Sequence, residues 1–264
     1  MHVLTAKKHR VLHITLNRPE KRNALTLEMA LAINQAVYQA QEDVEVGCIL
    51  ISAHGPVFCS GMDLDEASEA GHEHLEAAHD ELFSMGTRSL KPIVVAANGT
   101  ALGGGVGLVA QGHVVLAAEG AVFGLPEIRV GLWPFLVYRS VCAALGHRRT
   151  LELSLTGQPF HAEEAFEWGL VSRVCPAAEI ADRARSTARQ IAKASPQAVS
   201  CGMRYVRDAA GKPWEEAGKL AAVLRSELMD SADFQEGVLA FKQKREPRWP
   251  SMPVQFYQPK PNGE

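Results

Sequence analysis

The sequence predicts an α/β fold in which short buried strands alternate with helices. Residues 10–16 and 48–52 are rich in β-branched and apolar residues, as in buried strands. Between them, apolar residues from Leu27 to Val37 recur at helical spacing after Thr26. The order strand, helix, strand indicates a crossover unit between parallel strands.

Composition narrows the class of protein. The chain has 264 residues, 47% of them apolar and 22% charged, and a formal net charge of −3. This is typical of a globular protein with a full core, and it gives no basic field for nucleic acid. Five scattered cysteines favour reduced thiols over disulfides or a zinc site. With no signal-peptide core and no membrane-length apolar run, we expect a cytoplasmic protein without nucleic-acid or membrane partners.

The stretch at 96–110 is the centre of the predicted fold. An apolar run at 93–95 favours a buried strand, Asn98-Gly99 breaks it, and Gly103-Gly104-Gly105 precedes a new apolar run that can start a helix. The first N–H groups of a helix lack internal partners and attract negative charge. Glycines here fit either close packing or an anion or oxyanion site. The Gly-Lys-Ser/Thr ending of a phosphate-binding P-loop is absent.

A second bend follows the short strand predicted at 57–59. Ser60-Gly61 would present the N–H of Met62, whereas Cys59 has no adjacent base that would make it a nucleophile. Residues 65–81 are expected to form one polar helix that covers the site. Its residues His72, Glu73, His74 and His79 match no zinc spacing, so we expect no metal.

Glu127 is the candidate acid–base residue. It follows Pro126 in apolar surroundings after strands predicted at 114–118 and 121–124, and desolvation would raise its pKa. Helices are expected at 135–146, 147–155, 162–169 and 180–194, with a strand at 170–174. Ser195-Pro196 is the main boundary, which gives a core (1–195), a helical region (196–246) and a proline-rich tail (247–264). The tail is expected to be extended and to lie on a partner subunit.

Several short motifs together resemble the enoyl-CoA hydratase/isomerase, or crotonase, superfamily over about residues 11–245. They are Asn17-Arg18-Pro19, Asn23-Ala24-Leu25, Phe58 to Leu64, Asn98 to Gly105, Phe123 to Glu127, Leu155-Thr156-Gly157 and Trp168 to Val171. The resemblance implies a crotonase-like spiral of ββα units, a C-terminal helical trimerisation region, and a homotrimer or a hexamer of two trimers. It implies an acyl-CoA substrate, with coenzyme A as part of the substrate and no separate cofactor.

The resemblance also assigns roles by position. The N–H groups of Met62 and Gly104 would form the oxyanion hole, and Glu127 would move the proton. The CoA-binding residues would be Arg22, Ala24, Ser60, Met62, Asp63, Leu64 and Gly104, with Phe241 and Lys244 reaching a neighbouring subunit's CoA; for Lys244 a plain surface role is equally open.

One position departs from the family's hydratases. They carry a second glutamate three residues after the oxyanion glycine, and here that residue is Gly107. One carboxylate suits a 1,3-proton shift, so enoyl-CoA isomerisation is slightly favoured over hydration, with an apolar acyl pocket expected from Leu132, Trp133 and Phe135. Asp80 or Glu81 remains open as a replacement acid. The alternatives are an enoyl-CoA hydratase and a non-catalytic acyl-CoA- or RNA-binding member of the family.

Overall fold

Two β-sheets form the centre of the protein. The computed structural model describes residues 1–69 and 72–257. The six-stranded sheet has the order β1-β2-β3-β5-β7-β10, and the four-stranded sheet has the order β4-β6-β8-β9. The first consists of β1 (Val3–Lys8), β2 (Val11–Leu16), β3 (Cys48–Ala53), β5 (Ile93–Ala97), β7 (Val114–Ala118) and β10 (Arg173–Cys175); the second of β4 (Val57–Cys59), β6 (Thr100–Leu102), β8 (Val122–Gly124) and β9 (Phe160–His161).

Successive pairs of strands cross from one sheet to the other. β3, β5 and β7 lie side by side and parallel in the large sheet, and the strands that follow them, β4, β6 and β8, are parallel in the small sheet. Each turn of the chain therefore adds one strand to each sheet, which confirms the predicted spiral. The consequence for the site is that the ends of β4, β6 and β8 lie next to one another.

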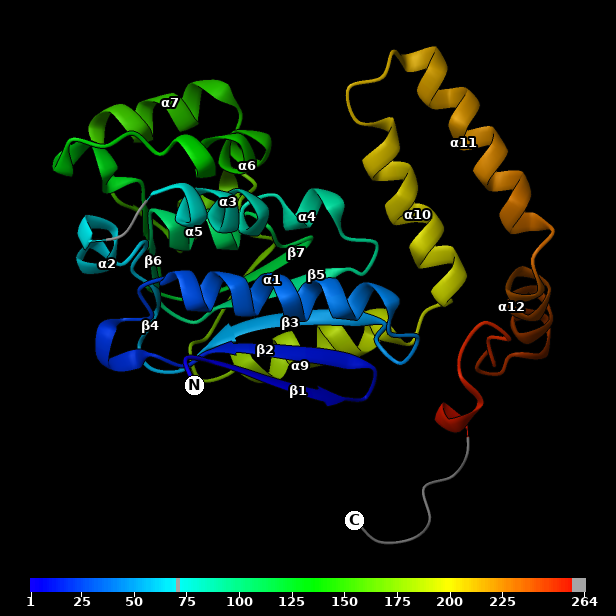
Figure 1. The fold of residues 1–264 in the computed structure, drawn as a ribbon. Coiled ribbons are helices and arrows are strands. Elements are labelled where there is room, and N and C mark those ends of the chain that lie inside the picture. Colours follow the sequence, from blue (N-terminus) through cyan, green and yellow to red (C-terminus); the bar gives the residue numbers. More distant parts are fainter. Residues whose placement is uncertain (70–71, 258–264) are drawn as a thin grey trace, which may run out of the picture.

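Helices cover both faces of the large sheet (Figure 1). α1 (Leu27–Glu42) begins at Thr26, whose hydroxyl accepts a hydrogen bond from Met29 N at 3.2 Å, and it buries Met29 and Ile33. α9 (Ile180–Ala192) packs on the opposite face through Ile180 and its small residues Ala184, Ala188 and Ala192. The remaining helices of the core are α2 (Leu64–Glu69), α3 (His72–Leu82), α4 (Met85–Arg88), α5 (Gly104–Val109), α6 (Phe135–Leu145), α7 (His147–Thr156) and α8 (Ala162–Glu167), with short 3₁₀ helices η1 (Pro19–Lys21) and η2 (Pro126–Val130).

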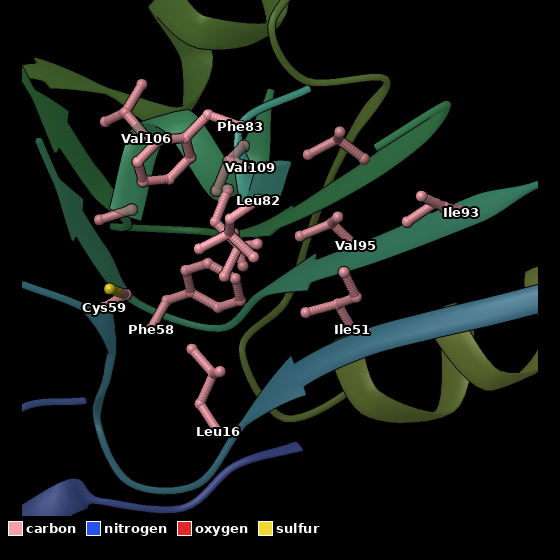
Figure 2. Packing of buried hydrophobic residues seen from close by; sticks show 14 of the residues in the cluster. Leu16, Ile51, Phe58, Cys59, Leu82, Phe83, Ile93, Val95, Val106 and Val109 are labelled. Atoms are coloured by element: carbon pink, nitrogen blue, oxygen red, sulfur yellow. The ribbon is translucent and has the colours of Figure 1, made fainter. Parts of the chain in front are cut away.

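The main core lies between the large sheet, the small sheet and α1, α3 and α5. Figure 2 shows Ile51 and Val95 of the large sheet on the same side as Phe58 of β4, with Leu82 and Phe83 above them. Phe58 and Leu82 are fully buried. This packing fixes α5 and the glycine turn before it against both sheets.

The helical arm beyond Ser195 projects from the core and returns to it (Figure 1). It contains α10 (Pro196–Ala209), α11 (Trp214–Met229) and α12 (Ala232–Gln243). Asp233 at the start of α12 is 3% exposed and accepts hydrogen bonds from the Ser195 hydroxyl at 2.5 Å and from Ser251 N at 2.9 Å. The two ends of the arm are therefore joined through one buried carboxylate.

The tail, which was expected to be extended, folds back on its own chain. Trp249 Nε1 donates to Lys193 O at 2.8 Å, Met252 is buried, and a final 3₁₀ helix η3 (Val254–Phe256) places Phe256 5.0 Å from the Arg10 guanidinium. The expected extended conformation was wrong for residues 249–257, because apolar and aromatic residues between the prolines pack on the core; contact of the tail with a partner subunit stays a prediction. Residues 258–264 lie outside the described part of the chain.

Other differences from the expected elements are local. The sequence reading missed β1, β6 and β9, which are short or partly exposed, and the single helix expected at 65–81 is α2 and α3, with residues 70–71 outside the described part. In the described ranges, no helix has the length and apolar character needed to cross a membrane.

Candidate active site

The glycine turn places the first N–H groups of α5 beside the segment that contains Met62. Gly103 lies between β6 and α5 with φ of 51°, a conformation that favours glycine. A Cβ at Gly104 would be 3.7 Å from Met62 N, and one at Gly61 would be 3.6 Å from Gly104 N. The two backbone donors named from the sequence therefore lie at one place.

Both donors are free to bind an oxygen atom. Met62 lies in an isolated parallel bridge with Leu25, in which Gly61 O and Asp63 N make the hydrogen bonds. Gly104 is the first residue of α5, so its N–H has no acceptor within the helix. Among the described residues, no acceptor takes a hydrogen bond from either N–H. Two unpaired donors at one place can hold a developing negative charge.

Glu127 lies against the same turn. β8 ends at Gly124, and η2 begins at Pro126, which brings Glu127 next to Gly103: a Cβ there would be 2.9 Å from Glu127 Oε1. Glu127 Oε2 is buried and has no hydrogen-bond partner. Burial raises the pKa of Glu127, because the carboxylate loses hydration there. A carboxylate whose pKa is raised in this way accepts a proton more readily than a free one.

Position 107 is filled by neighbouring side chains. Gly107 is buried on α5, and a Cβ there would lie 2.3 Å from Val137 Cγ1 and 2.9 Å from Phe83 Cδ1. A glutamate at this position would need α3 and α6 to move apart. Neighbouring side chains therefore leave no room for a second carboxylate at this position. The glycine in the sequence did not show this by itself.

The carboxylate considered as a replacement acid is held by cations. Asp80 on α3 forms ion pairs with Arg139 of α6 and, at 3.7 Å, with Arg88 of α4. Its side chain is 41% exposed. Its neighbour Glu81 is exposed as well. In this structure Asp80 therefore joins the helix over the site to α4 and α6 and is not a free carboxylate.

Two other residues considered from the sequence have unreactive surroundings. Burial raises the pKa of the Cys59 thiol to about 12, so it is a small apolar residue of the core. His79 is 4% exposed, its ring lies 5.5 Å from that of Phe83, and burial lowers its pKa to about 4, so it is neutral at pH 7. The side chains of His72, Glu73 and His74 lie outside the described part of the chain. Among described residues no three His, Cys, Asp or Glu side chains gather as metal ligands.

The residues expected around CoA lie on two adjoining segments. Arg22 follows η1 with φ of 53°, and its carbonyl accepts a hydrogen bond from Ser60 N at 3.0 Å. Ala24 is next to Leu25, the bridge partner of Met62, and Leu64 is 56% exposed at the start of α2. The side chain of Asp63 is buried and paired with Arg18 at 2.5 Å, its N–H donates to Leu25 O at 2.9 Å, and its carbonyl accepts from Ala67 N at 3.0 Å. A ligand at this residue would therefore have to share the Asp63 carbonyl.

Phe241 and Lys244 lie far from this place within one chain. Figure 1 shows α12 at the opposite side of the molecule from α2 and α5. Phe241 is 85% exposed, and Lys244 ends α12 with φ of 54°. A role for them at a CoA site requires a second copy of the chain.

The expected acyl pocket residues surround the start of α6. Trp133 stacks on Tyr138, with ring centroids 6.2 Å apart, and Tyr138 O–H lies 3.1 Å from His147 Nδ1. Leu132 is 42% exposed and Phe135 is 71% exposed. Together they form an apolar surface in the segment that continues from Glu127.

The buried carboxylate gives a pH test of the role expected for Glu127. If Glu127 is the base it must be ionised, and because burial raises its pKa, the acidic limb of kcat/KM should then have its midpoint above the value of about 4.3 of a free glutamate. We expect activity to fall as the pH is lowered through this raised pKa. A pH–rate profile with a midpoint at or below the ordinary value would contradict the assignment of Glu127 as the base.

Known proteins are similar to this one over nearly the whole chain. The family model for enoyl-CoA hydratase/isomerase matches residues 6–252. A probable mitochondrial enoyl-CoA hydratase of Dictyostelium discoideum is 36% identical over 93% of this chain and 89% of its own length. The human mitochondrial enoyl-CoA hydratase domain-containing protein 3 is 32% identical over 92% of this chain and 82% of its own.

Solved structures agree with the sequence comparison. A crystal structure of an enoyl-CoA hydratase from Mycobacterium smegmatis has a TM-score of 0.89 at 28% identity and covers 94% of this chain and 99% of that one. The mixed α/β fold with its C-terminal helical arm thus matches known crotonase structures. The chain belongs to the enoyl-CoA hydratase/isomerase family.

Proposed function

We propose that the protein converts enoyl-CoA thioesters through an enolate, with Met62 N–H and Gly104 N–H holding the thioester oxygen and Glu127 moving the proton. The observation that supports this proposal is that two unpaired backbone donors and one buried carboxylate meet at Gly103-Gly104. A thioester α-proton becomes removable when preorganised donors stabilise the enolate, and each donor typically contributes about a hundred- to a thousandfold in rate.

The packing at Gly107 favours isomerisation. Addition of water across a double bond is helped by a second carboxylate that orients the water, and Val137 and Phe83 occupy the place where it would stand. One carboxylate is sufficient for a 1,3-shift, in which Glu127 takes a proton from C2 and returns one at C4, leaving the atoms of the substrate unchanged in number. Phe83 and Val137 also give this side of the site an apolar lining.

Hydration is the second candidate. It is favoured by the names of the relatives, which are described as enoyl-CoA hydratases and, in Aspergillus fumigatus, as a mevalonyl-coenzyme A hydratase that is 34% identical over 90% of this chain. The attacking water would then have to be held by the substrate or by the backbone, because the carboxylate that would orient it is missing. The third reading, a binding protein without catalysis, is disfavoured by the raised pKa of Glu127 beside two free donors.

The proposal includes a homotrimer or a hexamer of two trimers. Apolar side chains are exposed along the arm, among them Trp214 at 92%, Val206 at 64% and Phe241 at 85%. Contact between arms would bury this surface and bring Phe241 and Lys244 to a neighbour's CoA groove.

The decisive experiment compares two substrates in deuterated water. The protein is incubated separately with a 2-enoyl-CoA and a 3-enoyl-CoA, and products are identified by mass spectrometry. We expect interconversion of the two enoyl forms with deuterium incorporation and without 3-hydroxyacyl-CoA. Formation of 3-hydroxyacyl-CoA from the 2-enoyl substrate would make hydration the reaction, and absence of any exchange or product would disprove the enolate mechanism.

A further inference from the structure

Two segments of the chain meet at Met62 and determine the direction of its N–H. Leu25 N donates to Gly61 O at 2.8 Å, and Asp63 N donates to Leu25 O at 2.9 Å. These bonds fix the peptide groups on both sides of Met62 and leave the Met62 N–H itself unpaired. The orientation of this donor therefore depends on how firmly the Leu25 segment, which follows β2 and η1, is held against the segment after β4.

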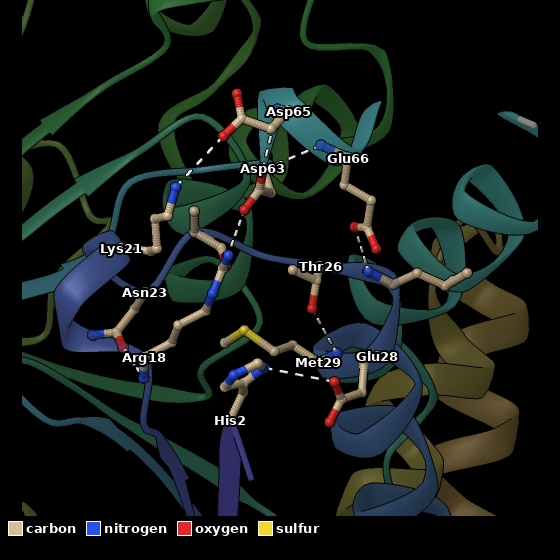
Figure 3. A network of polar contacts seen from close by, with 12 residues as sticks. His2, Arg18, Lys21, Asn23, Thr26, Glu28, Met29, Asp63, Asp65 and Glu66 are labelled. Atoms are coloured by element: carbon tan, nitrogen blue, oxygen red, sulfur yellow. Dashed lines mark hydrogen bonds and ion pairs between the residues drawn. The ribbon is translucent and has the colours of Figure 1, made fainter. Parts of the chain in front are cut away.

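Arg18 joins these two segments from below. Its Nη1 donates to Asp63 Oδ2 at 2.5 Å and to Ala24 O at 3.2 Å (Figure 3). Ala24 precedes Leu25, and Asp63 follows Met62, so one nitrogen atom contacts a residue next to each member of the bridge. The side chains of Arg18 and Asp63 are 14% and 8% exposed, respectively. Because little water reaches them, the pair is held more firmly than a surface ion pair.

The other carboxylate oxygen of Asp63 fixes the start of α2. Asp63 Oδ1 accepts hydrogen bonds from Asp65 N at 3.1 Å and from Glu66 N at 3.3 Å. Glu66 in turn accepts a hydrogen bond from Leu27 N at 2.8 Å, at the start of α1. The Asp63 carboxylate thus links Arg18 to the first turn of α2, and Figure 3 shows these residues converging between α1 and α2.

We propose that Arg18 is a positioning residue for the reaction, and that it acts on the Met62 N–H through Asp63 and Ala24. The inference rests on the proposed function, because it concerns the donor that would hold the enolate oxygen. Arginine is suited to this task because it stays charged and its planar fork holds two acceptors at fixed angles, whereas lysine is a point charge on a flexible stem. A displacement of the donor by a fraction of an ångström weakens its bond to the oxygen without removing it from the site.

The chain contains a matched control for the same two segments. Lys21 and Asp65 form an ion pair at 3.5 Å, with side chains 56% and 86% exposed. This outer pair also joins the segment after β2 to the segment after β4, but both of its side chains are largely exposed to solvent. Solvent screening makes such a pair nearly neutral for structure. Lys21→Gln should therefore leave the direction of the Met62 N–H unchanged.

The experiment measures the oxyanion contact directly. The probe is a saturated acyl-CoA labelled with ¹³C at the thioester carbonyl. It is bound to the wild type and to three variants, Arg18→Gln, Arg18→Lys and Lys21→Gln. For each protein we would record the infrared carbonyl frequency, the dissociation constant and the rate of α-proton exchange in deuterated water. In the wild type we expect a lowered carbonyl frequency. In Arg18→Gln we expect part of this shift to be lost, because the Gly104 N–H remains in place, and exchange to slow by up to about a hundredfold, the cost of losing one oxyanion donor completely.

The remaining variants separate positioning from folding. Arg18→Lys should recover part of the carbonyl shift, since it restores the charge opposite Asp63 but not the fixed fork, and Lys21→Gln should match the wild type. If Arg18→Gln does not fold, Asp63→Asn replaces it, because the amide keeps the cap of α2 and loses the acceptor for Arg18. An unchanged carbonyl frequency and exchange rate in folded Arg18→Gln or Asp63→Asn would overturn the proposal, whereas no shift and no exchange in the wild type would overturn the proposed function itself.

Discussion

Glu127→Gln is expected to lower turnover of enoyl-CoA by at least about a thousandfold, which is within the range for loss of a general acid–base group. The amide has the same shape as the carboxyl group but cannot accept the proton from C2. Because the proposed CoA contacts are made by other segments, the dissociation constant for acyl-CoA should stay close to that of the wild type. Turnover would be measured by interconversion of 2- and 3-enoyl-CoA, and binding by calorimetry.

The same substitution should stabilise the protein at neutral pH. The folded-state pKa of Glu127 is raised by burial, so above that pKa the wild type contains a desolvated carboxylate that the unfolded chain can hydrate. Glutamine carries no such cost, so its melting temperature should exceed that of the wild type. The difference should shrink as the pH falls through the raised pKa, because protonation then removes the cost from the wild type, and it should vanish below the ordinary value.

A control for this variant is Glu163→Gln, an exposed glutamate on α8. It should change neither turnover nor the melting temperature. Turnover retained in Glu127→Gln would remove Glu127 from the mechanism, and a melting temperature lowered at neutral pH would show that the carboxylate has a stabilising partner.

Gly107→Ala should destabilise the protein by about 1–3 kcal/mol, the usual cost of an extra methyl group in a filled core. The reason is the 2.3 Å separation between a Cβ at this position and Val137 Cγ1, with Phe83 Cδ1 at 2.9 Å. Adding Val137→Ala should recover part of the loss, because it removes the methyl group that collides. Denaturant unfolding of the single and double variants measures both free energies.

Gly202→Ala is the matched control, since Gly202 lies in α10 and a Cβ there meets nothing within 4 Å. Alanine is the better helix former by about 0.8–1 kcal/mol, so this variant should be more stable than the wild type. Because both substitutions are Gly→Ala in a helix, opposite signs of the change in the free energy of unfolding would isolate the effect of packing. Equal gains in both would mean that position 107 has room for a side chain.

The same packing limits attempts to install a water-binding acid. Gly107→Glu alone would place a longer side chain against Val137 and Phe83, so we expect loss of stability and no gain of hydratase activity. The residues that exclude the second carboxylate thus come from α6 and from the end of α3, far from Gly107 in sequence.

Local sequence patterns were sufficient for the alternation of strands and helices and for the residues of the turn, whereas the spiral came from the family resemblance. Asn98-Gly99 ends a strand and Gly103-Gly104-Gly105 allows a helix to start whatever the tertiary contacts are, because these residues act through local backbone freedom. The family resemblance supplied the pairing of this turn with Met62 and Glu127, which no local pattern could supply. The structure brings all three together; their roles stay proposals.

Contacts between distant side chains could not be predicted from the sequence. Arg18 was recognised only as part of a turn motif, and its contact with Asp63 depends on the packing of two segments that are 45 residues apart. Val137 gave no sign of its contact with Gly107, and Asp80 gave none of its ion pairs. The folded tail was missed for a related reason. Prolines near Trp249 suggested an extended chain, whereas Trp249 bonds to Lys193 and Ser251 bonds to Asp233, both of which are distant in sequence.

The return of the tail to Arg10 has a consequence for the order in which the chain can fold. Arg10 donates to Ala192 O at 3.1 Å and lies against Phe256, so the loop after the first strand is completed by residues from the far end of the chain. During synthesis the N-terminal hairpin leaves the ribosome long before Phe256 does. Until then the Arg10 side chain and the end of α9 lack their cover, and the last contacts formed are those of greatest sequence separation. Closure of the N-terminal edge is therefore expected to be a late step of folding.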